Sequence, residues 1–103
     1  MLEFNKEKLV KVLQREGWRD HEIEAMISLL GKVTSRLQKP FDEWMDHQVV
    51  SDEPLVEGWS IQSIMKLQKC HFLDALAIMD VYLDHPDLAK QYKNLYQRIE
   101  MNE

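Results

Sequence analysis

The chain has 103 residues, of which 45% are hydrophobic and 30% are charged, and its formal net charge is −5. This length fits a single globular domain with its own core. The acidic balance argues against a protein that holds nucleic acid by electrostatic attraction alone, because such proteins are basic. The N-terminus does not resemble a signal peptide, and no apolar run approaches the ~20 residues that span a bilayer. We therefore expect a cytoplasmic protein with no membrane segment.

The only cysteine is Cys70, so no internal disulfide can form, which suits the reducing cytosol. No second residue stands at a metal-ligand spacing, and neither a nucleophile motif nor a phosphate-binding loop is present. We therefore expect a protein that is not an enzyme and has no cofactor, no metal and no catalytic residue. Cys70 is interpreted as a structural thiol.

Two helices are predicted within residues 1–40. The first covers residues 5–16, with Asn5 as its N-cap and Gly17 as the residue that ends it. The second covers residues 20–38, where apolar residues recur at helical spacing over four turns behind a cap at Asp20. Lys39-Pro40 is expected to end this helix, because a residue that precedes proline avoids the helical conformation.

Residues 41–58 are predicted to form an acidic connector, because they hold six acidic residues and no Lys or Arg. A short helix is expected over 41–47 and a loop over 48–58, where Pro54 and Gly58 break regular structure. An exposed tryptophan here would be a binding anchor, since Trp is enriched at interface hot spots. The candidate partner-binding residues of this connector are Trp44, Asp46 and Glu53.

The last part of the chain, residues 59–103, is predicted to be trihelical. Helices are expected over 61–68 and 72–84, joined by a turn near 69–71, although one continuous helix over 61–83 stays open as an alternative. Ser60 can cap the first of these helices, and Pro86 suits the start of a last one. The last helix carries on one face Leu88, Tyr92, Leu95, Tyr96 and Ile99. Since no strand-like alternation occurs, the prediction is an all-α compact bundle of five or six helices.

The run Ser60-Ile61-x-x-Ile64, followed by Phe72-x-x-Ala75-x-x-Ile78-Met79-Asp80, resembles winged-helix DNA-binding domains such as the gamma domain of FtsK-type chromosome translocases. The resemblance implies a helix-turn-helix scaffold over residues 60–80. His71 stands where that family has a glycine in the turn, and Asp74 stands where it has an arginine. A helix is predicted where the family continues into a β-hairpin wing. We therefore expect a helix-turn-helix-like part without a wing.

A helix that reads DNA needs donors for phosphates and base edges, such as Arg, Lys, Asn or Gln. The helix over 72–84 offers Asp74, Asp80 and Asp84 instead, and only Lys66 and Lys69 beside the turn could contact nucleic acid. We therefore expect a small non-enzymatic regulatory or adaptor protein that binds a protein partner, with Asp74 as a further candidate partner-binding residue. Self-association into a homodimer stays open. The alternative is a dimeric DNA-binding transcriptional regulator with a helix-turn-helix, which would use the basic N-terminal helix.

Two further expectations concern packing. The predicted common core consists of Ile27, Leu30, Ile64, Ala75, Ile78 and Met79.

The tripeptide EGW occurs at 16–18 and again at 57–59, each time with an isoleucine five residues after the tryptophan. In the second copy Trp59 and Ile64 fit a hydrophobic staple around the cap. In the first copy the same register would make Arg19, not Asp20, the cap. We interpret the repeated tripeptide as two similar helix starts, with an internal duplication as the alternative.

Overall fold

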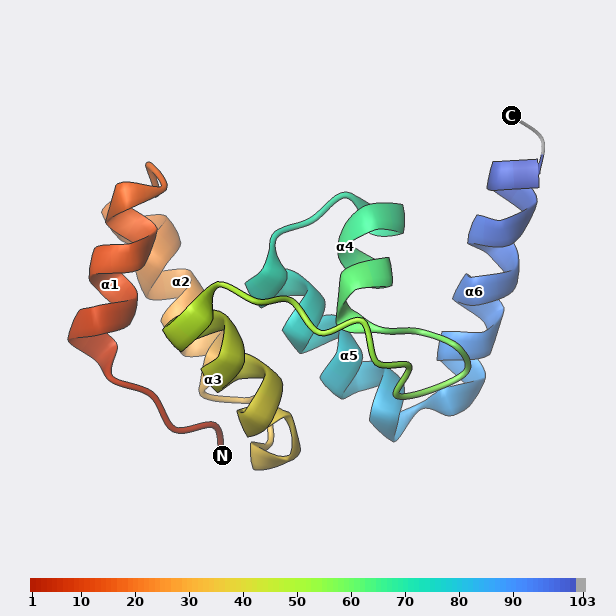
Figure 1. The fold of residues 1–103 in the computed structure, drawn as a ribbon, viewed down its shortest axis with the longest axis horizontal. Coiled ribbons are helices and arrows are strands. Elements are labelled where there is room, and N and C mark those ends of the chain that lie inside the picture. Colours follow the sequence, from red (N-terminus) through yellow and green to blue (C-terminus); the bar gives the residue numbers. More distant parts are fainter. Residues whose placement is uncertain (102–103) are drawn as a thin grey trace. The chain divides into compact units, whose positions relative to one another are not determined.

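The computed structural model describes residues 1–101 and is all-α, which confirms the predicted fold class. Within this range it has six α-helices and one short 3-10 helix, and the only extended pairing is an isolated bridge between Val56 and Trp59. The chain divides into two compact units, Met1–Val49 (unit 1) and Val50–Glu103 (unit 2). Unit 1 contains the first three α-helices and unit 2 contains the last three (Figure 1). No helix in the described range is long and apolar enough to cross a membrane.

Unit 1 is built from four helical segments: α1 (Lys6–Arg15), α2 (Asp20–Leu30), the 3-10 helix η1 (Ser35–Leu37) and α3 (Gln38–His47). The start of α1 is as predicted, because the Asn5 side chain accepts a hydrogen bond from the Lys8 N–H at 3.1 Å. Gly17 follows the helix at φ +92°, a left-handed conformation that glycine adopts without strain. Two hydrogen bonds hold the N-terminal segment against Gln38. The Glu3 backbone N–H donates to the Gln38 side-chain oxygen at 2.8 Å, and the Gln38 side-chain amide donates to the Glu3 carbonyl at 2.7 Å.

The prediction of one helix over residues 20–38 is wrong. The helix α2 ends at Leu30, and the chain then turns before the 3-10 segment. Val33 and Leu37 are nevertheless buried, so the apolar spacing continues after the helix has stopped. Pro40 does not end a helix but lies third in α3, where its missing N–H would have no partner within the helix. The predicted short helix over 41–47 is therefore present and begins earlier, at Gln38.

The predicted cap of α2 is also wrong, because Arg19 rather than Asp20 is the N-cap. The Glu22 carboxylate accepts the Arg19 backbone N–H at 2.9 Å. Both EGW copies therefore precede a helix in the same register, with their glycines at φ +92° and +79°. The first copy joins α1 to α2, whereas the second precedes the first helix of unit 2. This difference in placement favours two similar helix starts over a duplication.

Unit 2 consists of α4 (Ile61–Gln68), α5 (Phe72–Asp84) and α6 (Pro86–Met101), so residues 61–83 form two helices rather than one. Ser60 caps α4 as predicted: its hydroxyl accepts the Ser63 N–H at 3.0 Å, and the Ser63 hydroxyl accepts the Ser60 N–H at 2.9 Å. In the turn, Lys69 adopts a left-handed φ of 51°. The α6 helix follows α5 directly, as predicted for the last part of the chain.

Of the six residues of the predicted common core, four are buried: Leu30, Ile64, Ala75 and Met79. Ile27 and Ile78 are only partly buried, so the prediction is wrong for them. The six residues also belong to two units, since Ile27 and Leu30 lie in unit 1 and the others in unit 2. The buried apolar side chains of unit 2 are Trp59, Ile61, Ile64, Phe72, Leu73, Ala75, Leu76, Met79, Tyr82 and Ala89.

Candidate protein-interaction surface

Trp44 lacks the exposed side chain that a binding anchor needs. It is only 6% exposed, and its ring centroid lies 6.4 Å from that of Phe41 on the same helix. The candidate anchor in the connector is therefore a packing residue, and that part of the site prediction is wrong. The signal was present in the sequence, because Phe41, Trp44 and Met45 stand at the spacing of one buried helix face.

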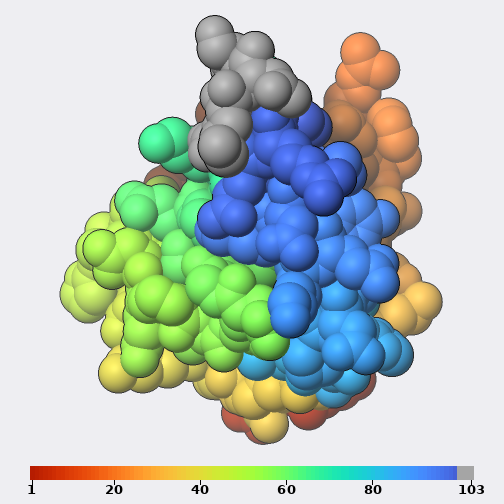
Figure 2. All heavy atoms as spheres, turned by 90° about the vertical axis from the view of Figure 1, so that its right-hand side faces the viewer, coloured from red at the N-terminus to blue at the C-terminus, as the bar shows by residue number. Residues whose placement is uncertain are grey.

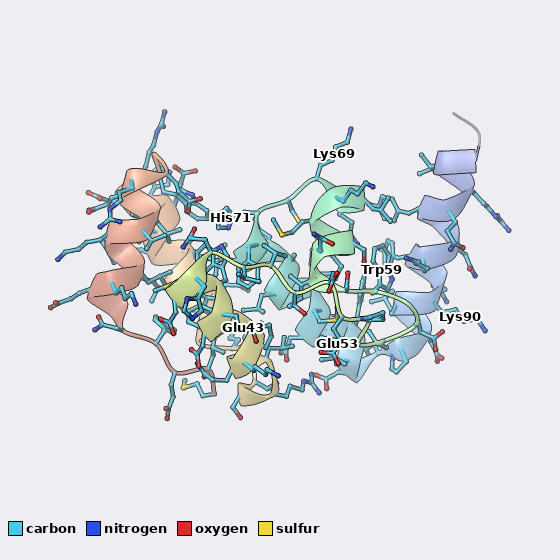
Figure 3. All side chains as sticks on the ribbon, in the orientation of Figure 1. Glu43, Glu53, Trp59, Lys69, His71 and Lys90 are labelled. Atoms are coloured by element: carbon cyan, nitrogen blue, oxygen red, sulfur yellow. The ribbon has the colours of Figure 1, made fainter. Side chains whose placement is uncertain are left out.

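The other predicted partner-binding residues are accessible and are divided between the two units. Asp46 forms an ion pair with Lys8 at 3.2 Å, and both side chains are about half exposed, at 56% and 53%. Glu53 lies exposed in the loop before α4, and Asp74 lies partly buried in the first turn of α5 (Figure 3 labels Glu53). Asp46 belongs to unit 1, whereas Glu53 and Asp74 belong to unit 2. The structure therefore does not define a single site from these residues.

The α5 helix has few side chains available to a ligand. Seven of its thirteen residues are buried: Phe72, Leu73, Ala75, Leu76, Met79, Asp80 and Tyr82. Asp80 is only 8% exposed, so its carboxylate adds little to the surface of this helix. Lys66 and Lys69 are exposed, and Figure 3 shows Lys69 directed away from the helices at the turn. Within α5 itself there is neither Lys nor Arg.

An aromatic cluster around Trp59 determines which side of α6 is buried. The Trp59 indole N–H donates a hydrogen bond to the Ala89 carbonyl at 2.7 Å, and Figure 3 shows this ring between α4 and α6. Its ring centroid lies 5.6 Å from Tyr82 and 6.1 Å from Tyr96. The Lys93 ammonium lies 4.7 Å from the centroid of the same indole. Ala89, Lys93 and Tyr96 therefore form the inner side of α6.

The neighbouring side of α6, together with part of α5, leaves large apolar side chains in water. Val81 is 47% exposed, Tyr92 41%, Leu95 49% and Ile99 48%, while Ile78 and Leu88 beside them are partly buried. We call these six residues the α5–α6 apolar surface. In Figure 2 the α6 helix, in blue, faces the viewer. Contiguous exposed apolar patches of this kind mark interaction sites on soluble proteins.

Two adjoining hollows lie in this surface. The first has a volume of about 260 Å³ and is lined by Gln68, Ile78, Val81, Tyr82 and Tyr92. The second has a volume of about 500 Å³ and is lined by Val81, His85, Asp87, Leu88 and Gln91. Val81 lines both, so the hollows are neighbours along the junction of α5 and α6. Their walls are mainly apolar, and the acidic group among them is Asp87.

The pKa values of the Cys70 thiol and the Tyr82 phenol in unit 2 are both raised. Burial raises the pKa of the Cys70 thiol, and the nearby negative charge of Asp74 raises it further. Burial also raises the pKa of the Tyr82 phenol, against the opposing effect of the hydrogen bond that Gln68 donates to it at 2.8 Å. A protonated thiol is a weak nucleophile, so this environment favours a structural role for Cys70.

This environment predicts slow thiol chemistry. In the folded protein, Cys70 is expected to react with a thiol-specific disulfide reagent more slowly than in the urea-unfolded chain at the same pH. The Asp74→Asn variant should react faster than the wild type, because it removes one cause of the raised pKa. Stopped-flow absorbance across alkaline pH measures both rates. Equal rates in the folded and unfolded chains, or no change in Asp74→Asn, would contradict the assignment.

The comparisons with known proteins find no relative. The chain matches no protein-family model, no curated protein and no solved structure. Among the described residues, no three His, Cys, Asp or Glu side chains are grouped so that they could hold a metal ion. Proposals about function therefore depend on the residues and surfaces of this chain.

Proposed function

We propose that this protein is a small non-enzymatic adaptor or regulatory protein of the cytoplasm, and that it binds another protein through the α5–α6 apolar surface. One observation supports the proposal most directly: four large apolar side chains on two adjacent helices are each exposed by more than two fifths. Removing apolar area from water contributes about 25 cal/mol per Å² toward binding, before the entropic cost of association is subtracted. A partner that covers these side chains would gain this free energy without reorganising the core of unit 2.

The chemistry of the surface favours a protein partner over nucleic acid. The side chains that line the hollows are aliphatic, aromatic or amide, with Asp87 as the acidic group and His85 beside it. Asp74 lies in the first turn of α5 and Asp84 at its end, and the sequence of that helix contains no Lys or Arg. Phosphate groups would meet repulsion there, whereas the apolar face of a protein helix would meet matching side chains.

The experiment that tests this proposal is an affinity pull-down from lysate of the native host, performed with and without nuclease treatment. The wild type is compared with Leu95→Lys, which places a charge in the middle of the surface. The matched control is Gln97→Lys, which adds the same charge to the same helix at an exposed position outside the surface. We expect the wild type and Gln97→Lys to retain one or more proteins that Leu95→Lys does not retain. Identical retention by all three, or retention lost with nuclease, would contradict it.

The proposal also predicts that α5 does not read DNA. At about 150 mM salt the wild type should not bind duplex DNA more tightly than about 1 µM, whereas specific readers reach the nanomolar range. An Asp74→Arg variant should gain only weak, salt-sensitive and sequence-independent binding. Fluorescence anisotropy with labelled duplexes measures both affinities.

Tight binding that Lys66→Ala or Lys69→Ala abolishes would contradict this prediction. Tight binding that is lost in Lys11→Glu would support the alternative of a DNA-binding regulator, because α1 exposes the basic side chains Lys6, Lys8, Lys11 and Arg15.

A further inference from the structure

We propose that the partner of the α5–α6 apolar surface is the same surface of a second copy of this chain, with the two α6 helices packed antiparallel. This inference rests on the proposed function, because it requires the surface to bind protein, and it goes further by naming the partner. It follows from two rows of residues on α6, one apolar and one polar.

The apolar row consists of Leu88, Tyr92, Leu95 and Ile99, which are separated by four, three and four residues. This is the spacing at which helices pack as coiled coils. The spacing is the same when read in either direction. Two antiparallel copies can therefore match Leu88 with Ile99 of the second copy, and Tyr92 with Leu95 of the second copy. No charged residue lies in this row.

The polar row lies beside the apolar row on the side of α6 that points away from Trp59. It consists of Asp87, Gln91, Asn94 and Arg98, at the same spacing, and all four side chains are exposed. The charge changes from negative at the start of the row to positive at its end, with two amides between. In an antiparallel pair, equivalent flanks of the two helices face each other. Asp87 would then lie near Arg98 of the second copy, and Gln91 near Asn94 of the second copy.

A parallel pair would not give this match. In a parallel pair the polar row would face the opposite flank of the second α6. That flank carries Ala89, Lys93 and Tyr96, and all three lie against Trp59 of their own unit. Asp87 of one copy would then not face Arg98 of the other. The charges and the internal packing of unit 2 therefore both favour the antiparallel arrangement.

The size of the surface sets the expected strength of the dimer. The α6 helix has 16 residues and so is about 24 Å long. The exposed parts of its apolar row, with Val81 and Ile78 from α5, offer an area on the order of half of the ~800 Å² per partner found in stable complexes. The dimer should therefore be weak and concentration-dependent, with a dissociation constant on the order of 10–100 µM.

Sedimentation equilibrium of the full chain tests the inference. The wild type is expected to change from monomer to dimer as its concentration passes through this range. Leu95→Lys should raise the dissociation constant of the dimer by about tenfold or more, because a charge enters the middle of the apolar row. Gln97→Lys should change it by less than about twofold. All replaced side chains are exposed, and circular dichroism of each variant checks that its helix content is unchanged.

Charge reversal tests the antiparallel arrangement. Asp87→Lys and Arg98→Glu should each weaken self-association by about twofold to tenfold, because each creates two repulsive contacts per dimer. Mixing the two variants in equal amounts should restore association. In the mixed pair each introduced lysine faces an introduced glutamate, and the remaining Arg98 faces the remaining Asp87. The double variant should likewise associate as the wild type does.

The outcomes separate this inference from the proposed function. A wild type that stays monomeric throughout the range overturns the inference. If such a monomer still captures a protein that Leu95→Lys loses, the proposed function stands with a different partner. If Leu95→Lys changes neither self-association nor capture, both fail. Self-association without recovery in the mixture overturns the antiparallel arrangement.

Discussion

Replacing Trp59 by alanine is expected to lower the free energy of unfolding by about 3–5 kcal/mol, the range found when a large aromatic side chain is removed from a core. The indole is fully buried and contacts Tyr82, Tyr96 and Lys93. Its removal also leaves the Ala89 carbonyl without the hydrogen bond that the indole donates at 2.7 Å. Urea unfolding followed by far-UV circular dichroism measures the loss.

Two further variants make the test specific. Trp59→Phe keeps most of the ring and loses the hydrogen bond, so its cost should be about 1–2 kcal/mol. Trp18→Ala changes the equivalent residue of the first EGW copy, which is only partly buried, and should cost less than Trp59→Ala. If Trp59→Ala and Trp18→Ala are equally destabilising, Trp59 does not have the central packing role described for unit 2.

Met79→Ala is expected to lower the free energy of unfolding by about 2–5 kcal/mol, whereas Ile78→Ala should cost only about 1 kcal/mol. These neighbours on α5 have different surroundings, because Met79 is fully buried and Ile78 lines an open hollow. The same urea titration measures both variants. Equal losses, or a larger loss for Ile78→Ala, would show that the inner face of α5 has been assigned incorrectly.

The helices of unit 2 were predictable because local signals determine their ends. Ser60 and Ser63 cap α4 through reciprocal hydrogen bonds between neighbours in the sequence. Pro86 begins α6, as its fixed φ and missing N–H favour. The position of the turn between α4 and α5 was predicted correctly. The turn contains Lys69 in the left-handed conformation, although lysine has no special preference for that conformation.

The helices of unit 1 were harder to predict because residues after Leu30 are still buried at helical spacing although the backbone there is no longer α-helical. Val33 and Leu37 keep the helical spacing and are buried, yet they lie in a turn and in a 3-10 helix. Periodicity reports which residues face the core, and it does not report whether the backbone between them stays helical. Pro40 was likewise ambiguous, since proline suits both the residues after one helix and the first turn of the next.

Only part of the α5–α6 apolar surface could be predicted from the sequence. The apolar face of the last helix was recognised from its spacing, including Tyr92, Leu95 and Ile99. Which part of that face is covered depends on Trp59, thirty residues from its hydrogen-bond partner Ala89. Tyr96 turns toward this indole and Leu95 stays in water. A contact between distant residues therefore decides the site, and no local pattern encodes it.

The distribution of tryptophans gives each unit its own spectroscopic reporter. Trp18 and Trp44 belong to unit 1, and Trp59 belongs to unit 2. A chain with Phe at positions 18 and 44 would keep a single indole, with two tyrosine rings within about 6 Å of it, at 5.6 and 6.1 Å. Energy absorbed by these phenols would pass to Trp59 most efficiently while α5 and α6 hold the rings close to it. Comparing the loss of this energy transfer with the loss of total helix signal would reveal whether the two units unfold in one step or in sequence.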